Sequence, residues 1–167
     1  MTKTDKNLQE AFAGESQANR RYLAFAQAAD KEGLPQVARL FRAAAEAETV
    51  HAHNHLRAMG GIGKTADNLQ AAITGETYEF ESMYPGFITQ AEKDSNGKAG
   101  MSFKYANAVE KLHAALYKTA AAAVAKGSDL PARPIFVCPI CGNTVEGEPP
   151  ASCPICGAAK DRFKKVD

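Results

Sequence analysis

The sequence predicts a mainly α protein, in which a four-helix bundle over residues 1–130 is followed by a small loop-rich unit over residues 131–167. Long Ala-rich stretches fill the first part, and alanine is the strongest helix former. All four cysteines lie between positions 138 and 156, and six of the eight prolines lie after position 130. Because such clusters are typical of short units with little apolar core, the chain divides into two parts.

Helix-breaking residues separate four long helices in the first part. A proline inside the third helix, Pro85, is expected to kink it, because proline lacks the N–H that the helix needs. After the fourth helix, two further prolines predict a stiff linker. The breaks are, in order, Glu32 to Pro35, Gly60 to Gly63, Ser95 to Gly97 and Gly127-Ser128, followed by Pro131 and Pro134 in the linker.

Charge and hydropathy exclude two classes of partner. The chain has 20 Lys+Arg against 19 Asp+Glu and a formal net charge of +1, so we expect neither a nucleic acid nor an anionic membrane surface as partner. No stretch approaches the roughly 18 apolar residues of a membrane span, and the first ten residues lack the apolar segment of a secretory signal. We therefore expect a cytoplasmic protein.

The two halves of the helical part repeat one another, at offsets of 61 or 62 positions. The first two helices are thus predicted to form a hairpin, and the last two a second copy of it. Two such hairpins are expected to face each other across a pseudo-twofold axis. The clearest matches are Gly14-Glu15 with Gly75-Glu76, and Glu48-x-x-His51 with Glu110-x-x-His113.

Each helix also carries Glu, or Glu and His, in the middle of its apolar stripe. Buried carboxylates repel one another and cost several kcal/mol each to desolvate unless a cation compensates, and no Lys or Arg occupies these positions. An isolated Glu-x-x-His is common on solvated helices. Two copies in register with further Glu residues instead match di-iron carboxylate bundles. The candidate metal ligands are Glu15, Glu48, His51, Glu76, Glu79, Glu110 and His113.

The four cysteines form two identical knuckles, each Cys-Pro-Ile-Cys-Gly. Cys138 and Cys141 belong to the first, and Cys153 and Cys156 to the second. Four thiolates suit a tetrahedral Zn or a single Fe, whereas disulfides are disfavoured in a cytoplasmic chain. A structural zinc ribbon stays open as an alternative. Since this unit has few apolar residues, a bound metal must help to fold it.

Together, these motifs resemble the rubrerythrin family over essentially the whole chain. The pattern is specific, because ferritins share the bundle but not the tail. The resemblance implies a ferritin-like four-helix bundle followed by a small rubredoxin-like metal-knuckle domain. The matching segments are residues 12–22, 45–51, 75–79, 83–85 and 110–113, and both knuckles.

The resemblance also implies an activity, cofactors and partners. It points to a peroxidase that reduces hydrogen peroxide to water at a di-iron site, with electrons passing through an FeS4 site from an NAD(P)H-dependent reductase or rubredoxin. Glu79, His51, Tyr22 and Tyr84 are then the catalytic candidates, the two tyrosines by hydrogen bonds near the irons. Family members are homodimers in which one subunit's FeS4 site lies near the other's di-iron site.

Charge counting suggests how the site works. Glu79 aligns with Ala18 of the first repeat, so the site has five carboxylates against four positive charges of two ferrous ions or six of two ferric ions. We therefore expect Glu79 to bind iron in the diferric state and to leave on reduction, with His51 taking its place. The stiff linker is expected to hold the FeS4 unit away from the centre of its own bundle, so that electrons pass between the subunits of a homodimer.

Two other functions fit parts of the pattern. A ferritin-like ferroxidase or iron-handling protein would need the bundle but no electron inlet. A protein with a structural zinc ribbon could use its bundle for another di-metal role, including oxygen scavenging.

Overall fold

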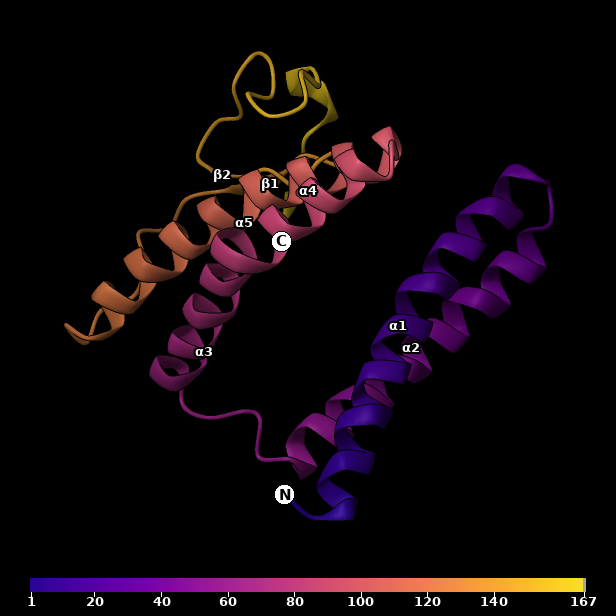
Figure 1. The fold of residues 1–167 in the computed structure, drawn as a ribbon, viewed down its shortest axis with the longest axis horizontal. Coiled ribbons are helices and arrows are strands. Elements are labelled where there is room, and N and C mark those ends of the chain that lie inside the picture. The colour runs from indigo at the N-terminus through magenta and orange to yellow at the C-terminus, as the bar shows by residue number, and fades with distance from the viewer. Residues whose placement is uncertain (167) are drawn as a thin grey trace. The chain divides into compact units, whose positions relative to one another are not determined.

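The computed structural model describes residues 1–166, which form two helical hairpins and a small sheet (Figure 1). The chain divides into two compact units after Gly63. The first unit holds α1 (Lys3–Lys31) and α2 (Pro35–Ala58). The second begins with α3 (Thr65–Tyr78), the π-helical turn η1 (Glu79–Met83), α4 (Tyr84–Lys93) and α5 (Gly97–Val124). The predicted fold class, mainly α with ferritin-like helices and a rubredoxin-like tail, is confirmed.

Small residues hold the first hairpin together. Ala38, Ala45 and Ala52 follow one another at heptad spacing along α2, and all three are buried. From α1, the buried side chain of Asn19 donates from Nδ2 to the carbonyl of Ala45 at 2.6 Å and to Oγ1 of Thr49 at 2.8 Å. Alanine lets the two backbones approach closely enough for this contact, so the hairpin is joined by a polar bond as well as by packing.

The third predicted helix is interrupted, as expected, but the interruption lies before Pro85. The π-helical turn η1 ends where the N–H of Tyr84 donates to the carbonyl of Glu79, five residues back. Pro85 then stands in the first turn of α4, where a helix needs no donor. The wider turn thus places the proline where its missing N–H costs nothing.

An inserted residue accounts for this turn. Before η1 the two hairpins match at an offset of 61, as in Glu15 and Glu76, and after it they match at 62. The later match includes a cluster of three rings in each hairpin, with centroids 5.6–6.4 Å apart in the first and 5.5–6.3 Å apart in the second. The extra residue therefore falls inside the π-helical turn, as is typical of such turns. The clusters are Tyr22, Phe25 and Phe41, and Tyr84, Phe87 and Phe103.

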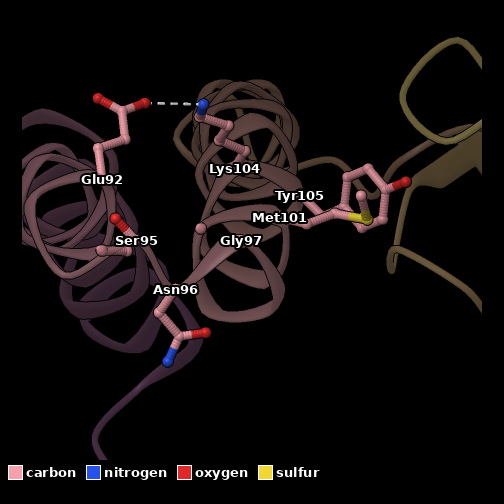
Figure 2. A pocket seen from close by; sticks show the side chains of 9 residues that line it. Glu92, Ser95, Asn96, Gly97, Met101, Lys104 and Tyr105 are labelled. Carbon is pink, nitrogen blue, oxygen red and sulfur yellow. Dashed lines mark hydrogen bonds and ion pairs between the residues drawn. The ribbon is translucent and has the colours of Figure 1, made fainter.

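The turn between α4 and α5 has its own small cavity, of about 430 Å³ (Figure 2). Ser95 adopts a positive φ of 54°, and the Asn96 side chain then caps α5 by accepting from the N–H of Ala99 at 3.1 Å. Across the turn, Lys104 Nζ lies 2.9 Å from Glu92 Oε1. None of the predicted metal ligands is among the described residues that line this cavity.

The C-terminal part is a three-stranded antiparallel sheet in the order β2-β1-β3. Its strands are β1 (Ile135–Val137), β2 (Thr144–Glu146) and β3 (Lys164–Val166), with a short 3-10 turn, η2 (Lys160–Arg162), before β3. Side chains alternate between the two faces. On one face Phe136 and Val145 pack around the cysteines with Phe163. On the other, Val137 and Thr144 line a cavity with residues of α5.

This sheet lies against the α5 of its own chain. The Val109 side chain comes within 3.7 Å of the position that a Cβ on Gly142 would take. Thr144 Oγ1 lies 2.9 Å from His113 Nε2. The sheet packs on α5 because the outer face of β1 is apolar. Val137 of this face and Leu116 of α5 line the same cavity.

In the described part of the chain, no helix is both long enough and apolar enough to cross a membrane.

Candidate metal centres

The first group of candidate ligands lies in the first hairpin and comprises Glu15 of α1 with Glu48 and His51 of α2. One donor atom from each of the three lies within 4.8 Å of the others. His51 Nδ1 is 3.0 Å from Glu48 Oε2, as the i, i+3 spacing on one helix face requires. The Glu48 side chain is 17% exposed, whereas that of His51 is 53% exposed. His51 is therefore the most accessible donor of this group.

The second group lies in the second hairpin and has the same composition. Glu76 of α3 meets Glu110 and His113 of α5, again with donor atoms within 4.8 Å of one another. His113 Nδ1 is 2.8 Å from Glu110 Oε2 and 3.8 Å from Glu76 Oε1. The side chains are more enclosed here, since His113 is only 27% exposed. Each hairpin thus assembles one carboxylate and one Glu-x-x-His pair, as the repeat predicts.

Negative charge accumulates in the second group. Burial, followed by the charge of Glu110, a hydrogen bond with it and the charge of Glu79, raises the pKa of Glu76 to about 7. Burial and Glu110 also raise the pKa of Glu79. For Tyr84, burial and then the charges of Glu79, Glu110 and Glu76 raise the pKa. Glu79 and Tyr84 therefore both lie near enough to Glu110 to feel its charge.

The donor sets fit metal ions. In the described chain, the carboxylates of the two groups form ion pairs only with histidines, and no Lys or Arg pairs with them. A divalent cation would supply the missing positive charge, and mixed carboxylate and imidazole donors suit iron, manganese or zinc. Tyr22, the remaining catalytic candidate, packs its ring against Phe25 and Phe41 in the first hairpin.

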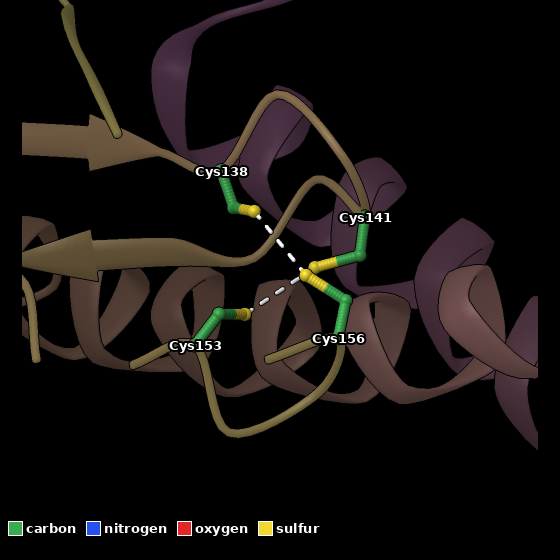
Figure 3. A group of neighbouring side chains, drawn as sticks. All are labelled: Cys138, Cys141, Cys153 and Cys156. Carbon is green, nitrogen blue, oxygen red and sulfur yellow. Dashed lines mark hydrogen bonds between the residues drawn. The ribbon is translucent and has the colours of Figure 1, made fainter. Parts of the chain in front are cut away.

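The four cysteines come together in the C-terminal sheet unit as free thiols (Figure 3). Cys138 Sγ is 3.6 Å from Cys156 Sγ, and Cys141 Sγ is 3.5 Å from Cys153 Sγ. Sulfur atoms about 2.3 Å from a central ion in a regular tetrahedron are about 3.8 Å apart. The thiols are therefore arranged for one tetrahedral ion.

The backbone favours thiolates in these knuckles. Although burial disfavours the charge, N–H groups of Cys156 and Ile155, together with hydrogen bonds to the thiols of Cys141 and Cys156, lower the pKa of Cys153 to about 7. Burial instead raises the pKa of Cys141, against a backbone bond from Asn143. Gly142 and Gly157 have φ of 86° and 76°, which a side chain would strain, so each glycine lets the chain turn under the sulfur.

Sequence reasoning missed two residues beside these sites, Asn143 and Thr144. The buried Asn143 donates from Nδ2 to Cys153 Sγ at 3.7 Å, and Thr144 contacts His113. One signal was present in the sequence. After its glycine the first knuckle continues with Asn-Thr, whereas the second continues with Ala158-Ala159. The two otherwise identical motifs therefore differ at the two positions whose side chains contact Cys153 and His113.

Comparisons with known proteins agree with this geometry. Residues 6–121 match the family model described as Rubrerythrin, and residues 136–164 match the one described as Rubrerythrin, rubredoxin-like domain. The chain is 36% identical to Rubrerythrin-2 of Clostridium acetobutylicum, over 94% of this chain and 93% of that protein. It is 37% identical to Nigerythrin of Nitratidesulfovibrio vulgaris, over 96% and 85%.

Solved structures of nigerythrin are also similar. The structure of its mixed-valence state aligns with a TM-score of 0.57 and 34% identity, covering 99% of this chain and 88% of that one. The structure of its fully reduced, all-ferrous state gives the same TM-score with 35% identity. The structure has two Glu/His groups, one in each hairpin, and one cluster of four thiols. Since the matches also cover nearly the whole length, the chain belongs to the rubrerythrin family.

Proposed function

We propose that this protein is a non-haem di-iron peroxidase that reduces hydrogen peroxide to water, with electrons supplied through the four-cysteine site. Membership of the rubrerythrin family supports an oxidoreductase of this general type. The single observation that carries the proposal is the presence, in one chain, of two Glu/His groups and a four-thiol cluster. The nigerythrin structures, described as mixed-valent and all-ferrous, show that a relative holds iron that changes oxidation state.

The proposed ligands divide between the two hairpins and the sheet unit. When bound, two ferrous ions supply the two electrons that O–O cleavage requires, and a sulfur-bound iron passes on one electron at a time. The donors for the two irons are Glu15, Glu48, His51, Glu76, Glu79, Glu110 and His113, and those for the single iron are Cys138, Cys141, Cys153 and Cys156.

Glu79 has the clearest role among the residues that are not in the repeat. It lies at the first position of the π-helical turn, and its counterpart in the first hairpin is Ala18, which has no donor atom for a metal. Burial and Glu110 raise its pKa, so a Glu79 side chain that leaves a metal binds a proton more readily than an exposed glutamate does. Peroxide reduction consumes two protons for each pair of electrons. Glu79 is thus placed to couple its own release to proton delivery.

Tyr84 and His51 complete this proposal. The pKa of Tyr84 is raised by burial and by the neighbouring carboxylates, so its phenol stays protonated and can donate a hydrogen bond into the site. The His51 side chain is more than half exposed, and we propose that it binds iron when the site is reduced and Glu79 has left. We infer the same hydrogen-bonding role for Tyr22, the counterpart of Tyr84 in the first hairpin.

Three measurements on the purified protein test the proposal. Metal analysis and visible absorption distinguish iron from zinc among the four thiols, because FeS4 is coloured and reducible whereas ZnS4 is neither. NAD(P)H-dependent turnover of hydrogen peroxide is then measured with an added reductase and rubredoxin. We expect iron at both sites and steady peroxide reduction. A reducible FeS4 site without peroxide turnover would contradict the peroxidase, and zinc among the thiols would favour a ferroxidase with a structural ribbon.

A further inference from the structure

His113 is held at both ring nitrogens, and its counterpart His51 is not. Nδ1 of His113 faces the carboxylates, 2.8 Å from Glu110 Oε2, while Nε2 lies 2.9 Å from Thr144 Oγ1. His51 has the same contact at Nδ1, to Glu48 at 3.0 Å, but its Nε2 has no hydrogen-bonding partner within the described part of the chain. The two groups therefore have the same donor residues but differ in the hydrogen bond at the Nε2 of the histidine.

The hydroxyl of Thr144 has one hydrogen, and its second contact shows where that hydrogen goes. Thr144 Oγ1 lies 3.1 Å from the carbonyl oxygen of Gly142, which can only accept. Thr144 therefore donates to Gly142 and accepts from the Nε2–H of His113. A ring that carries its proton at Nε2 offers the Nδ1 lone pair to a metal among Glu76 and Glu110.

The surroundings strengthen this contact. His113 and Thr144 share the wall of a cavity of about 350 Å³ with apolar side chains, among them Leu116 and Val137. A hydrogen bond beside apolar groups is stronger than one in water, because little solvent competes for it. Thr144 itself is fixed in β2, where its partner across the ladder is Val137. The hydroxyl is thus held on a rigid element rather than on a loop.

We propose that Thr144 is a positioning residue for His113: it holds the ring with Nδ1 toward Glu76 and Glu110, and so makes the metal position of the second hairpin the tighter of the two. The proposal rests on metal binding by the Glu/His groups, which belongs to the proposed function, but not on peroxide chemistry. Partners that orient a metal-bound histidine commonly affect metal affinity by about 10–100-fold.

The test is an anaerobic Fe²⁺ titration of the full chain, with the four-cysteine site already filled. For the original protein we expect two unequal binding steps. Thr144→Val, which keeps the shape but removes the hydroxyl, should weaken the tighter step by about 10–100-fold. Thr144→Ser should restore it. As a matched control, Thr119→Val removes a hydroxyl on α5 that bonds only to its own helix, at the carbonyl of Ala115, and should bind like the original.

A second measurement needs no variant and covers the case in which Thr144→Val fails to fold. In ¹⁵N-histidine NMR of the Zn²⁺-loaded chain, the Nε2–H of His113 should exchange slowly with water, while that of His51 exchanges fast. Fast exchange at His113, or a Thr144→Val protein that binds Fe²⁺ as the original does, would overturn the inference. Absence of any Fe²⁺ binding to the original chain at the Glu/His groups would instead overturn the proposed function.

Discussion

Tyr84 occupies in the second hairpin the place that Tyr22 occupies in the first. Each ring lies 6.2–6.4 Å from two phenylalanine rings of its own hairpin, and the two tyrosines are 62 positions apart in the chain. Glu76 follows Glu15 by only 61 positions. The residue added between these pairs lies in the π-helical turn, next to Glu79. This change of offset thus lies beside Glu79, the one carboxylate among the candidate metal ligands that has no counterpart in the first hairpin.

Removing this extra residue tests the role of the turn. Ser82 is exposed within η1, and its deletion restores the offset of 61 throughout. We expect a regular helix there and equal or higher thermal stability, because π turns have poorer hydrogen bonds than α-helices. Peroxide turnover should fall by about tenfold or more, as Glu79 loses its freedom to exchange. A deletion protein that keeps full turnover would show that the turn is only structural.

Glu79 itself can be changed with little loss of shape. Glu79→Gln keeps the side-chain volume but removes the charge, so we expect about two irons per chain to bind still and peroxide turnover to drop by at least about tenfold, equal to about 1.4 kcal/mol in the barrier. Steady-state kinetics and metal analysis of the same sample measure both quantities. Glu81→Gln, an exposed change in the same turn, is the control and should leave turnover unchanged.

The stability of the metal-free protein should depend on pH through Glu76. Burial and Glu110 raise the pKa of Glu76 from 4.5 to about 7 in the folded chain, so the folded state binds this proton more tightly than the unfolded state. The contribution to the free energy of unfolding is complete below pH 4.5 and is lost as pH rises through 7, by at most about 3 kcal/mol. Urea unfolding at several pH values measures it.

Glu76→Gln should flatten this dependence, because glutamine does not titrate. With metal bound, the dependence should reverse, since a metal requires the deprotonated carboxylate. If the metal-free Glu76→Gln protein loses as much stability with rising pH as the original does, another group is responsible.

Loss of the metal from the four thiols should unfold the sheet unit and leave the helices folded. The buried core around the cysteines contains one large apolar side chain, Phe163, with half-buried neighbours such as Val145, which is too little to stabilise three strands of three residues each. Cys153→Ser should therefore lose the dispersed sheet signals in an NMR spectrum while the helical circular dichroism persists. Ser152→Ala, beside it and exposed, is the control. A folded sheet in Cys153→Ser would contradict a folding role for the metal.

Much of the site could be predicted because its donors are repeated locally. Glu48 and His51, like Glu110 and His113, are three residues apart on one helix, so helical geometry alone brings each pair together. The same holds for Cys138 and Cys141, which one tight turn joins. Thr144 and His113 are 31 positions apart, and no periodicity connects a strand of the C-terminal sheet to a helix of the hairpin. Their contact was beyond sequence reasoning.

The sequence by itself determined the helices, the repeated Glu/His pairs, the two cysteine knuckles and hence the family, because each depends on spacings of a few residues and on intrinsic preferences of the chain. Only the tertiary structure decided that the extra residue forms a π-helical turn and that the sheet lies on the α5 of its own chain. It also decided that His113 Nε2 has a partner in Thr144, whereas His51 Nε2 has none among the described residues. These features depend on which apolar faces pack together, and packing is a property of surfaces formed only after the chain has folded.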